Sequence, residues 1–454
     1  MRVFFAACLA ALLSAHPAAA FCGFYVAKAD AELFNQASKV VYMRDGDRSV
    51  ITMASDYLGA PAEFAMVIPT PSVLSERQIH VTDAAIVDHL DAYTAPRLVE
   101  YYDEDPCQKR LMMMRSTAVM EDAGAPPLGE KSLGVTVEAS YTIGEYDIQI
   151  LSAEQSGGLA QWLTQNGYNV PEKAERALGQ YIAMGMKFFV AKVNLAAHDK
   201  IGGGFLRPLQ IAFESPDFML PIRLGMVNAR GSQDLLLYTL TRKGRVETSN
   251  YRTTRMPTDI EVPLFTATEF DDIYRAGFDA VIAREGGSGV VMEYAWDMAW
   301  CDPCAADPLS RAQLVELGAF WLADEIPSTG GAQPKPNQRI MPGPAVDAFV
   351  TRLHARYDDE SFSEDLMLRV TEDRTNFQGR YIMRHPWRGD SVCEASEAYF
   401  ASLPKRFERE AQALANFTRW PIADIRQKMA ATGQDPNAPP PEPAPWWEKI
   451  WPDR

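Results

Sequence analysis

Cys301 and Cys304, which are separated by two residues, are the side chains in this sequence whose types and spacing best suit chemistry. Thiols at this spacing serve as a structural disulfide, as a redox pair, or as half of a metal site. A redox pair needs one thiolate, which the backbone N–H groups and dipole of a helix N-terminus stabilise. In that case Cys301 would attack a substrate disulfide and Cys304 would resolve the mixed disulfide.

The residues around the pair read Trp300-Cys301-Asp302-Pro303-Cys304 and follow an apolar stretch that favours a strand. This segment resembles the thioredoxin active site, where a strand leads into a Trp-Cys-x-Pro-Cys turn at a helix N-terminus. The resemblance implies a thiol-disulfide oxidoreductase. However, Pro308 falls where that helix would already be running, and helix signals restart only around Ser310. A structural disulfide is therefore favoured over a redox pair.

A metal site is the third use of the pair, and it would add Cys393 and perhaps His385 as ligands. The gap of about eighty residues before these side chains makes the pattern unspecific. We expect no metal and no cofactor. The other histidines show no metalloprotease spacing, and we expect them on the surface or at caps: His80, His89, His198 and, on a helix, His354.

The first twenty residues predict export. Arg2 precedes an apolar run from Val3 to Ser14, and Ala18 and Ala20 fit the small-x-small rule for cleavage before Phe21. The apolar run is too short to span a bilayer permanently, so we expect no transmembrane segment after cleavage. The expected location is periplasmic or secreted.

Export makes disulfides the default state of the remaining cysteines. Cys8 leaves with the leader, and the disulfide candidates in the mature chain are Cys22, Cys107, Cys301, Cys304 and Cys393. Two bridges and one free thiol can be arranged in fifteen ways, with five choices of free thiol and three pairings for each. The sequence does not choose among these arrangements.

Charge and the C-terminus indicate which partners to expect. Cleavage removes one of the 44 basic residues and none of the 60 acidic ones, so the mature chain carries a net charge of −17. Such a surface repels phosphate backbones, and nucleic acid is not an expected partner. The proline-rich segment from Pro436 to Pro445 precedes three indoles that could contact an unknown envelope partner, namely Trp446, Trp447 and Trp451.

The pattern of apolar residues predicts an α+β fold. An antiparallel β-rich domain with packed helices is expected over residues 21–265, where the Asp45-Gly46 turn marks a hairpin from Lys39 to Ser55. A mainly helical region containing the Cys-x-x-Cys is expected over residues 266–432, followed by a Pro/Trp-rich tail over 433–454. The helices expected in that region are Glu269 to Glu285, Leu309 to Leu322, Val346 to Tyr357 and Tyr399 to Phe417.

The whole chain resembles a bacterial family of exported proteins, domain of unknown function 2330. The resemblance rests on Cys22-Gly23-Phe24-Tyr25-Val26, Lys39 to Ser55, Glu63 to Pro69, Asn166-Gly167-Tyr168, Phe188 to Val193, Leu206 to Gln210, Leu220 to Gly225 and Arg380-Tyr381-Ile382. It implies an exported envelope protein and supplies no activity and no catalytic residues.

No convergent set of acid, base and nucleophile is evident in the sequence. We therefore expect a non-catalytic binding or scaffold role in the envelope. The alternative is a thiol-disulfide oxidoreductase that uses Cys301 and Cys304.

Overall fold

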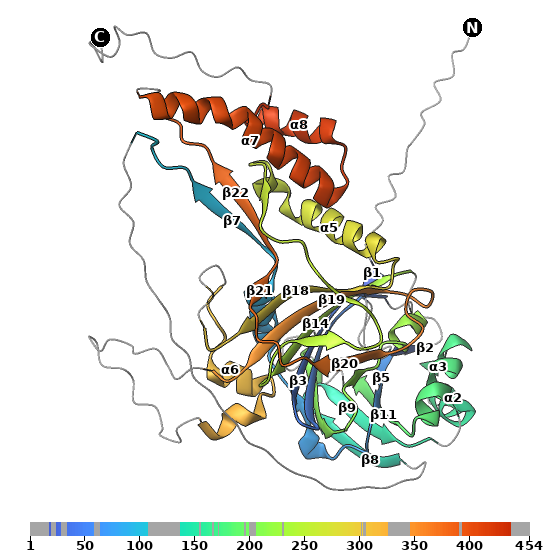
Figure 1. Ribbon diagram of the computed structural model, residues 1–454. Helices are drawn as coiled ribbons and strands as arrows, with labels where there is room; N and C mark the ends of the chain where they lie inside the picture. Colours follow the sequence, from blue (N-terminus) through green and yellow to red (C-terminus); the bar gives the residue numbers. More distant parts are fainter. Residues whose placement is uncertain are drawn as a thin grey trace, which may run out of the picture.

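The chain folds into an α+β structure, which confirms the expected fold class. Two large β-sheets stack on each other, helices cover their outer faces, and a helical arm projects from one end (Figure 1). The computed structural model describes residues 18–19, 24–28, 34–58, 64–107, 137–153, 156–165, 168–170, 172–194, 197–198, 206–228, 231–300, 302, 306–325, 346–389 and 393–436.

The larger sheet has ten strands in the described part of the chain. Eight of them lie in the order β16 (Thr253–Arg255), β18 (Val290–Asp297), β19 (Phe349–Tyr357), β14 (Gln233–Thr241), β3 (Phe34–Asp45), β4 (Arg48–Leu58), β12 (Leu209–Glu214) and β6 (Ile79–Val81). The two short strands β1 (Ala18–Ala19) and β21 (Phe377–Gln378) pair with β14 and β18. β1 falls within the expected leader.

The expected hairpin is confirmed as β3 and β4, which pair in register from Ser38 opposite Ser55 to Asp45 opposite Arg48. Gly46 takes a φ of 58° in the turn, a conformation that favours glycine. Side chains alternate across the sheet, so Ile51 and Met53 face the smaller sheet while Val50 faces the helices behind.

The smaller sheet has six strands within the described residues, and every pair is antiparallel. Its order is β10 (Tyr168–Asn169), β2 (Phe24–Lys28), β5 (Phe64–Thr70), β11 (Lys187–Val193), β9 (Tyr146–Leu151) and β8 (Val137–Ile143). Helices α2 (Ser156–Gln165) and α3 (Glu172–Ala183) cover its outer face, where Leu163, Leu178 and Phe188 share a buried cluster. The main core lies between the two sheets.

Helices α1 (Ala84–Thr94) and α6 (Arg311–Glu316) cover the opposite face of the larger sheet. α1 is capped by Asp83, whose side chain accepts a hydrogen bond from the Ala85 amide. α6 is shorter than expected, because the segment continues as the 3₁₀ turn η4 (Phe320–Glu325). Two further 3₁₀ turns are η2 (Glu76–Gln78) and η3 (Gly225–Asn228).

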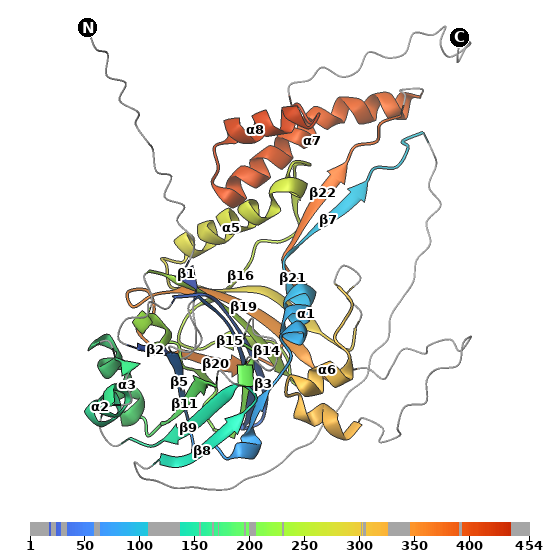
Figure 2. The same ribbon diagram turned by 180° about the vertical axis from the view of Figure 1, so that it is seen from behind.

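The arm combines three helices with a small parallel sheet, and Figures 1 and 2 show it extending beyond the stacked sheets. Its strands are β17 (Ile260–Val262), β22 (Arg380–His385) and β7 (Arg97–Tyr102), and its helices are α5 (Thr266–Arg284), α7 (Glu394–Thr418) and α8 (Ile422–Ala431). Gly277 lets α7 approach α5, because a Cβ at that position would lie 2.0 Å from the Phe417 ring. No helix in the described residues is long and apolar enough to cross a membrane.

The predicted helix from Val346 to Tyr357 is wrong, because this segment forms the central strand β19. Eight of its nine residues are buried, so both faces of the strand are covered. A strand buried on both faces has no polar side, and periodicity cannot distinguish it from a buried helix. Pairing with β14 and β18 decides the outcome.

Strands from both sides of residue 265 share the larger sheet, since β19 lies between β18 and β14. One sheet thus joins the two expected regions. The domain boundary at residue 265 stays a prediction. One further small sheet, β13 (Met219–Leu220), β20 (Leu366–Val370) and β15 (Val246–Thr248), also joins segments from both regions.

Candidate functional site

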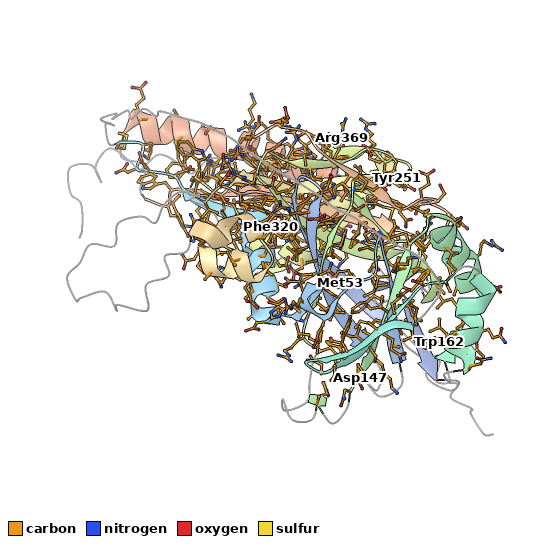
Figure 3. All side chains as sticks on the ribbon, turned by 90° about the horizontal axis from the view of Figure 1, so that it is seen from below. Met53, Asp147, Trp162, Tyr251, Phe320 and Arg369 are labelled. Atoms are coloured by element: carbon orange, nitrogen blue, oxygen red, sulfur yellow. A yellow bond between two sulfur atoms is a disulfide. The ribbon has the colours of Figure 1, made fainter. Side chains whose placement is uncertain are left out.

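A cavity of about 250 Å³ lies between the two large sheets. Its walls come from β4 and β12 of the larger sheet, from the end of β5 in the smaller sheet, and from residues 214–221. Four methionines line it: Met53, Met184, Met186 and Met219. In Figure 3, Met53 lies in the middle of the body, and Trp162 and Asp147 lie toward its periphery.

The lining of the cavity is mainly apolar. Ile211 and Phe213 point into the core between the sheets, and both are buried. Thioether side chains are flexible and polarizable, so they adapt to ligands of irregular shape. Met184 is 52% exposed, which places it where the cavity meets solvent. An apolar chamber that opens at one end can take up a small apolar molecule.

The loop that walls the cavity is anchored by Arg44 on β3. Its Nη2 donates to the backbone oxygens of Ser215, at 3.0 Å, and Pro216, at 3.1 Å. The guanidinium also lies 5.0 Å from the centre of the Phe218 ring. A buried arginine therefore fixes the position of the loop by satisfying its carbonyl groups. The Arg44 contacts thus fix the position of one wall of the cavity.

A second cluster of polar side chains lies on the other face of the larger sheet, under α1 and α5. Its centre is Glu293 on β18, which is 0% exposed. The register between β18 and β19 shifts between Met292 and Tyr294, so Glu293 occupies a β-bulge. Bulges redirect side chains, and this one places a carboxylate inside the protein.

Glu293 accepts hydrogen bonds from three side chains. Arg352 Nε lies 2.7 Å from Oε2, His354 Nδ1 lies 2.9 Å from Oε1, and the Tyr274 hydroxyl donates to Oε1. Burial by itself would raise the pKa of Glu293, but the charges of His354 and Arg352 keep that pKa below its ordinary value of 4.5. The carboxylate is therefore ionised and fully engaged.

The cluster continues in two directions. Toward α1, Arg352 Nη1 donates to Asp91 at 2.6 Å, and the Tyr238 hydroxyl donates to the same carboxylate at 2.7 Å. Burial would raise the pKa of Asp91, but Arg352 and Lys39 lower it to about 2. The pairs thus link α1 to the sheet.

Toward α5, His354 lies between Glu293 and Asp234, with Nε2 at 3.4 Å from Asp234 Oδ1. Its ring stacks on Phe278, with 3.7 Å between the ring centres. Burial opposes protonation, yet the negative charges of Glu293 and Asp234 raise the pKa of His354 above 6.5. His354 was expected at the surface of a helix, and it lies buried on a strand instead.

Sequence reasoning missed this cluster. Glu293 is far from Arg352 and His354 in the sequence, and the latter two alternate on one short segment. No spacing rule connects the three residues. The available signal was weak: three polar residues, Thr351, Arg352 and His354, interrupt an apolar run. In a buried strand such residues need partners, which only the neighbouring elements supply.

The two cysteines singled out from the sequence, Cys301 and Cys304, lie outside the described residues, as does Cys22. Asp302 between them is described and buried, and it accepts a hydrogen bond from the Tyr294 hydroxyl at 3.0 Å. Residues 306–310 are not helical, and α6 begins only at Arg311. The thioredoxin arrangement places a helix directly after the first thiol, and these described residues do not form one.

The other two cysteine candidates are bonded to each other. Cys107 follows β7 and Cys393 precedes α7, and a disulfide joins them across 286 residues of sequence. This bond fastens the outer end of the arm. Cys393 is thereby removed as a metal ligand, since it has no free thiol. The indoles Trp446, Trp447 and Trp451 lie outside the described residues.

Comparison with known proteins identifies one related group. A family model described as an uncharacterized protein conserved in bacteria (DUF2330) matches residues 16–369. This range includes the cavity, the Glu293 cluster and both large sheets apart from the short strand β21. Neither a curated protein nor a solved structure is similar enough to match the chain.

The Glu293 cluster generates a prediction about stability. Glu293→Gln removes a buried negative charge, so Arg352 keeps only Asp91 and His354 keeps only Asp234 as a carboxylate partner. We expect the free energy of unfolding to fall by about 3–5 kcal/mol, measured by urea denaturation. Asp88→Asn is the control, because Asp88 pairs with Lys39 at 2.8 Å but is 67% exposed. That change should cost about 0–1 kcal/mol. Equal losses in the two variants would contradict a central role for Glu293.

His354 generates a prediction about pH. A histidine whose pKa is raised by folding contributes stability below its unfolded value, and that contribution is lost as pH rises through the folded value. The free energy of unfolding should therefore decline as pH rises above 6.5, the ordinary value. Denaturation across this range in wild type and in His354→Gln measures the effect. The decline should be absent in the variant, and parallel curves would refute the assignment.

Proposed function

The chain belongs to the bacterial DUF2330 family of uncharacterized proteins, and from that premise we propose that it is an exported envelope protein that binds a small apolar ligand between its two large sheets. The observation that carries the proposal is the methionine-lined cavity of about 250 Å³. The role is one of binding and not of catalysis.

The size of the cavity indicates the size of the ligand. An engineered apolar cavity of 150 Å³ holds benzene, so 250 Å³ suits a molecule of roughly ten non-hydrogen atoms. Burying about eight methylene groups contributes roughly 6 kcal/mol, which corresponds to a dissociation constant on the order of 10–100 µM. Affinity in this range is adequate for a carrier or a sensor of a moderately abundant compound.

Two features support a place outside the cytoplasm. The sequence carries an apolar leader with an Ala18-Ala19-Ala20 site, and a disulfide between Cys107 and Cys393 closes the arm. Disulfides persist in the periplasm and outside the cell and are rare in the cytosol. The indoles at Trp446, Trp447 and Trp451 would then face envelope components, and we propose that they contact an envelope partner.

The proposed export predicts the N-terminus and the disulfide of the purified protein. Protein recovered from the periplasmic fraction should begin at Phe21 and contain a Cys107–Cys393 peptide, both identified by mass spectrometry. The same digest shows how Cys22, Cys301 and Cys304 are paired. Recovery of the intact leader with a reduced Cys107 from the cytosolic fraction would overturn the proposed export.

The cavity predicts binding of a neutral apolar probe. Titration calorimetry with 1-octanol should give a dissociation constant on the order of 10–100 µM and a negative heat-capacity change. Ile211→Trp fills the chamber and should weaken binding at least roughly fivefold.

The matched control is Ile260→Trp, which makes the same exchange on β17 outside the cavity and should leave binding unchanged. Circular dichroism confirms that each variant is folded. Absence of heat up to the solubility limit of octanol in folded wild-type protein would remove the proposed function.

A further inference from the structure

The charged residues that line the cavity are all of one sign within the described part of the chain. The described residues that line it include two acidic ones, Glu214 and Asp217, and no lysine, arginine or histidine. Both acidic residues belong to the exposed part of the lining. The charged residues of the lining are therefore acidic, and none of its described residues is cationic.

The two acidic residues differ in where their side chains point. Glu214 pairs with Arg48 in the β12–β4 ladder, and its carboxylate lies 3.8 Å from Arg48 Nε. Side chains alternate along β12, so Glu214 is on the opposite face from Phe213, which faces the core between the sheets. The Glu214 carboxylate is thus directed away from the cavity, and only its backbone can border it.

Asp217 is the acidic residue that remains at the mouth. It is exposed, and no described cation lies within ion-pair distance of its carboxylate. Arg44 donates to the backbone oxygen of Asp217 at 3.3 Å and pairs with Asp47 at 3.6 Å. The Asp217 side chain is therefore available to a ligand.

We propose that the ligand of this cavity is a small apolar cation, such as an aliphatic amine or a quaternary ammonium compound. Its hydrocarbon part lies against Met53, Met186 and Ile211, and its positive group lies at the mouth beside Asp217. This inference rests on the proposed function and adds the charge of the ligand to it.

Electrostatics favours a cation over the other amphiphiles. Burial of the hydrocarbon part contributes the same free energy for every head group. The head group therefore decides the differences in affinity among molecules of equal chain length. A carboxylate head would be repelled by Asp217 and by a chain whose net charge is −16. A positive head gains an exposed ion pair, which is modest in strength and weakened by salt.

The test compares three probes with the same eight-carbon chain: octyltrimethylammonium, 1-octanol and octanoate. Titration calorimetry at low ionic strength should show the ammonium probe binding roughly threefold more tightly than octanol, and octanoate roughly threefold more weakly. Raising the salt concentration should bring the three affinities together.

Two isosteric variants assign the preference to a side chain. Asp217→Asn should abolish the difference between the ammonium probe and octanol while leaving octanol binding unchanged. Glu214→Gln is the matched control, because it removes the same charge a few residues away from a side chain that faces Arg48. The preference should persist in that variant.

The outcomes separate the two proposals. If octanol does not bind, the proposed function itself fails. If octanol binds but octanoate binds at least as tightly as the ammonium probe, the proposed binding cavity is supported and the proposed cationic ligand is refuted. An ammonium preference that survives Asp217→Asn likewise overturns the assignment to Asp217.

Discussion

The buried carboxylate of Glu293 is the constraint on which the packing of this protein depends. A charge without solvent is tolerated only when partners surround it, and here β19 supplies Arg352 and His354 while α5 supplies Tyr274. Arg352 extends the contact to Asp91 on α1. One bulge in β18 thus fixes two helices against the same face of the sheet.

The opposite face of that sheet is organised mainly by apolar contacts, and it carries the cavity. Two twisted sheets stack without complete filling where β4 and β12 meet the end of β5. Methionines line the gap, and Arg44 holds the adjacent loop by its carbonyl groups. The polar face therefore provides rigidity, and the apolar face provides a chamber that a ligand can enter.

The arm shows how the chain uses covalent bonding where packing is sparse. β7 is an edge strand with exposed Tyr101 and Tyr102, and it follows β22 away from the stacked sheets. The Cys107–Cys393 disulfide closes its far end. A cross-link over so long a sequence strongly reduces the conformational entropy of the unfolded chain. This stabilisation offsets the small area that β7 buries at the far end of the arm.

The sequence by itself determined the fold class, the β3–β4 hairpin and the helices α5 and α7, because these follow from local periodicity and turn residues such as Asp45-Gly46. It also identified Cys107 and Cys393 as disulfide candidates, although not as partners. Only the tertiary structure decided that Phe349–Tyr357 is a strand, that His354 is buried, and where the cavity lies. Each of these depends on contacts between distant segments, and such contacts leave no pattern within any one segment.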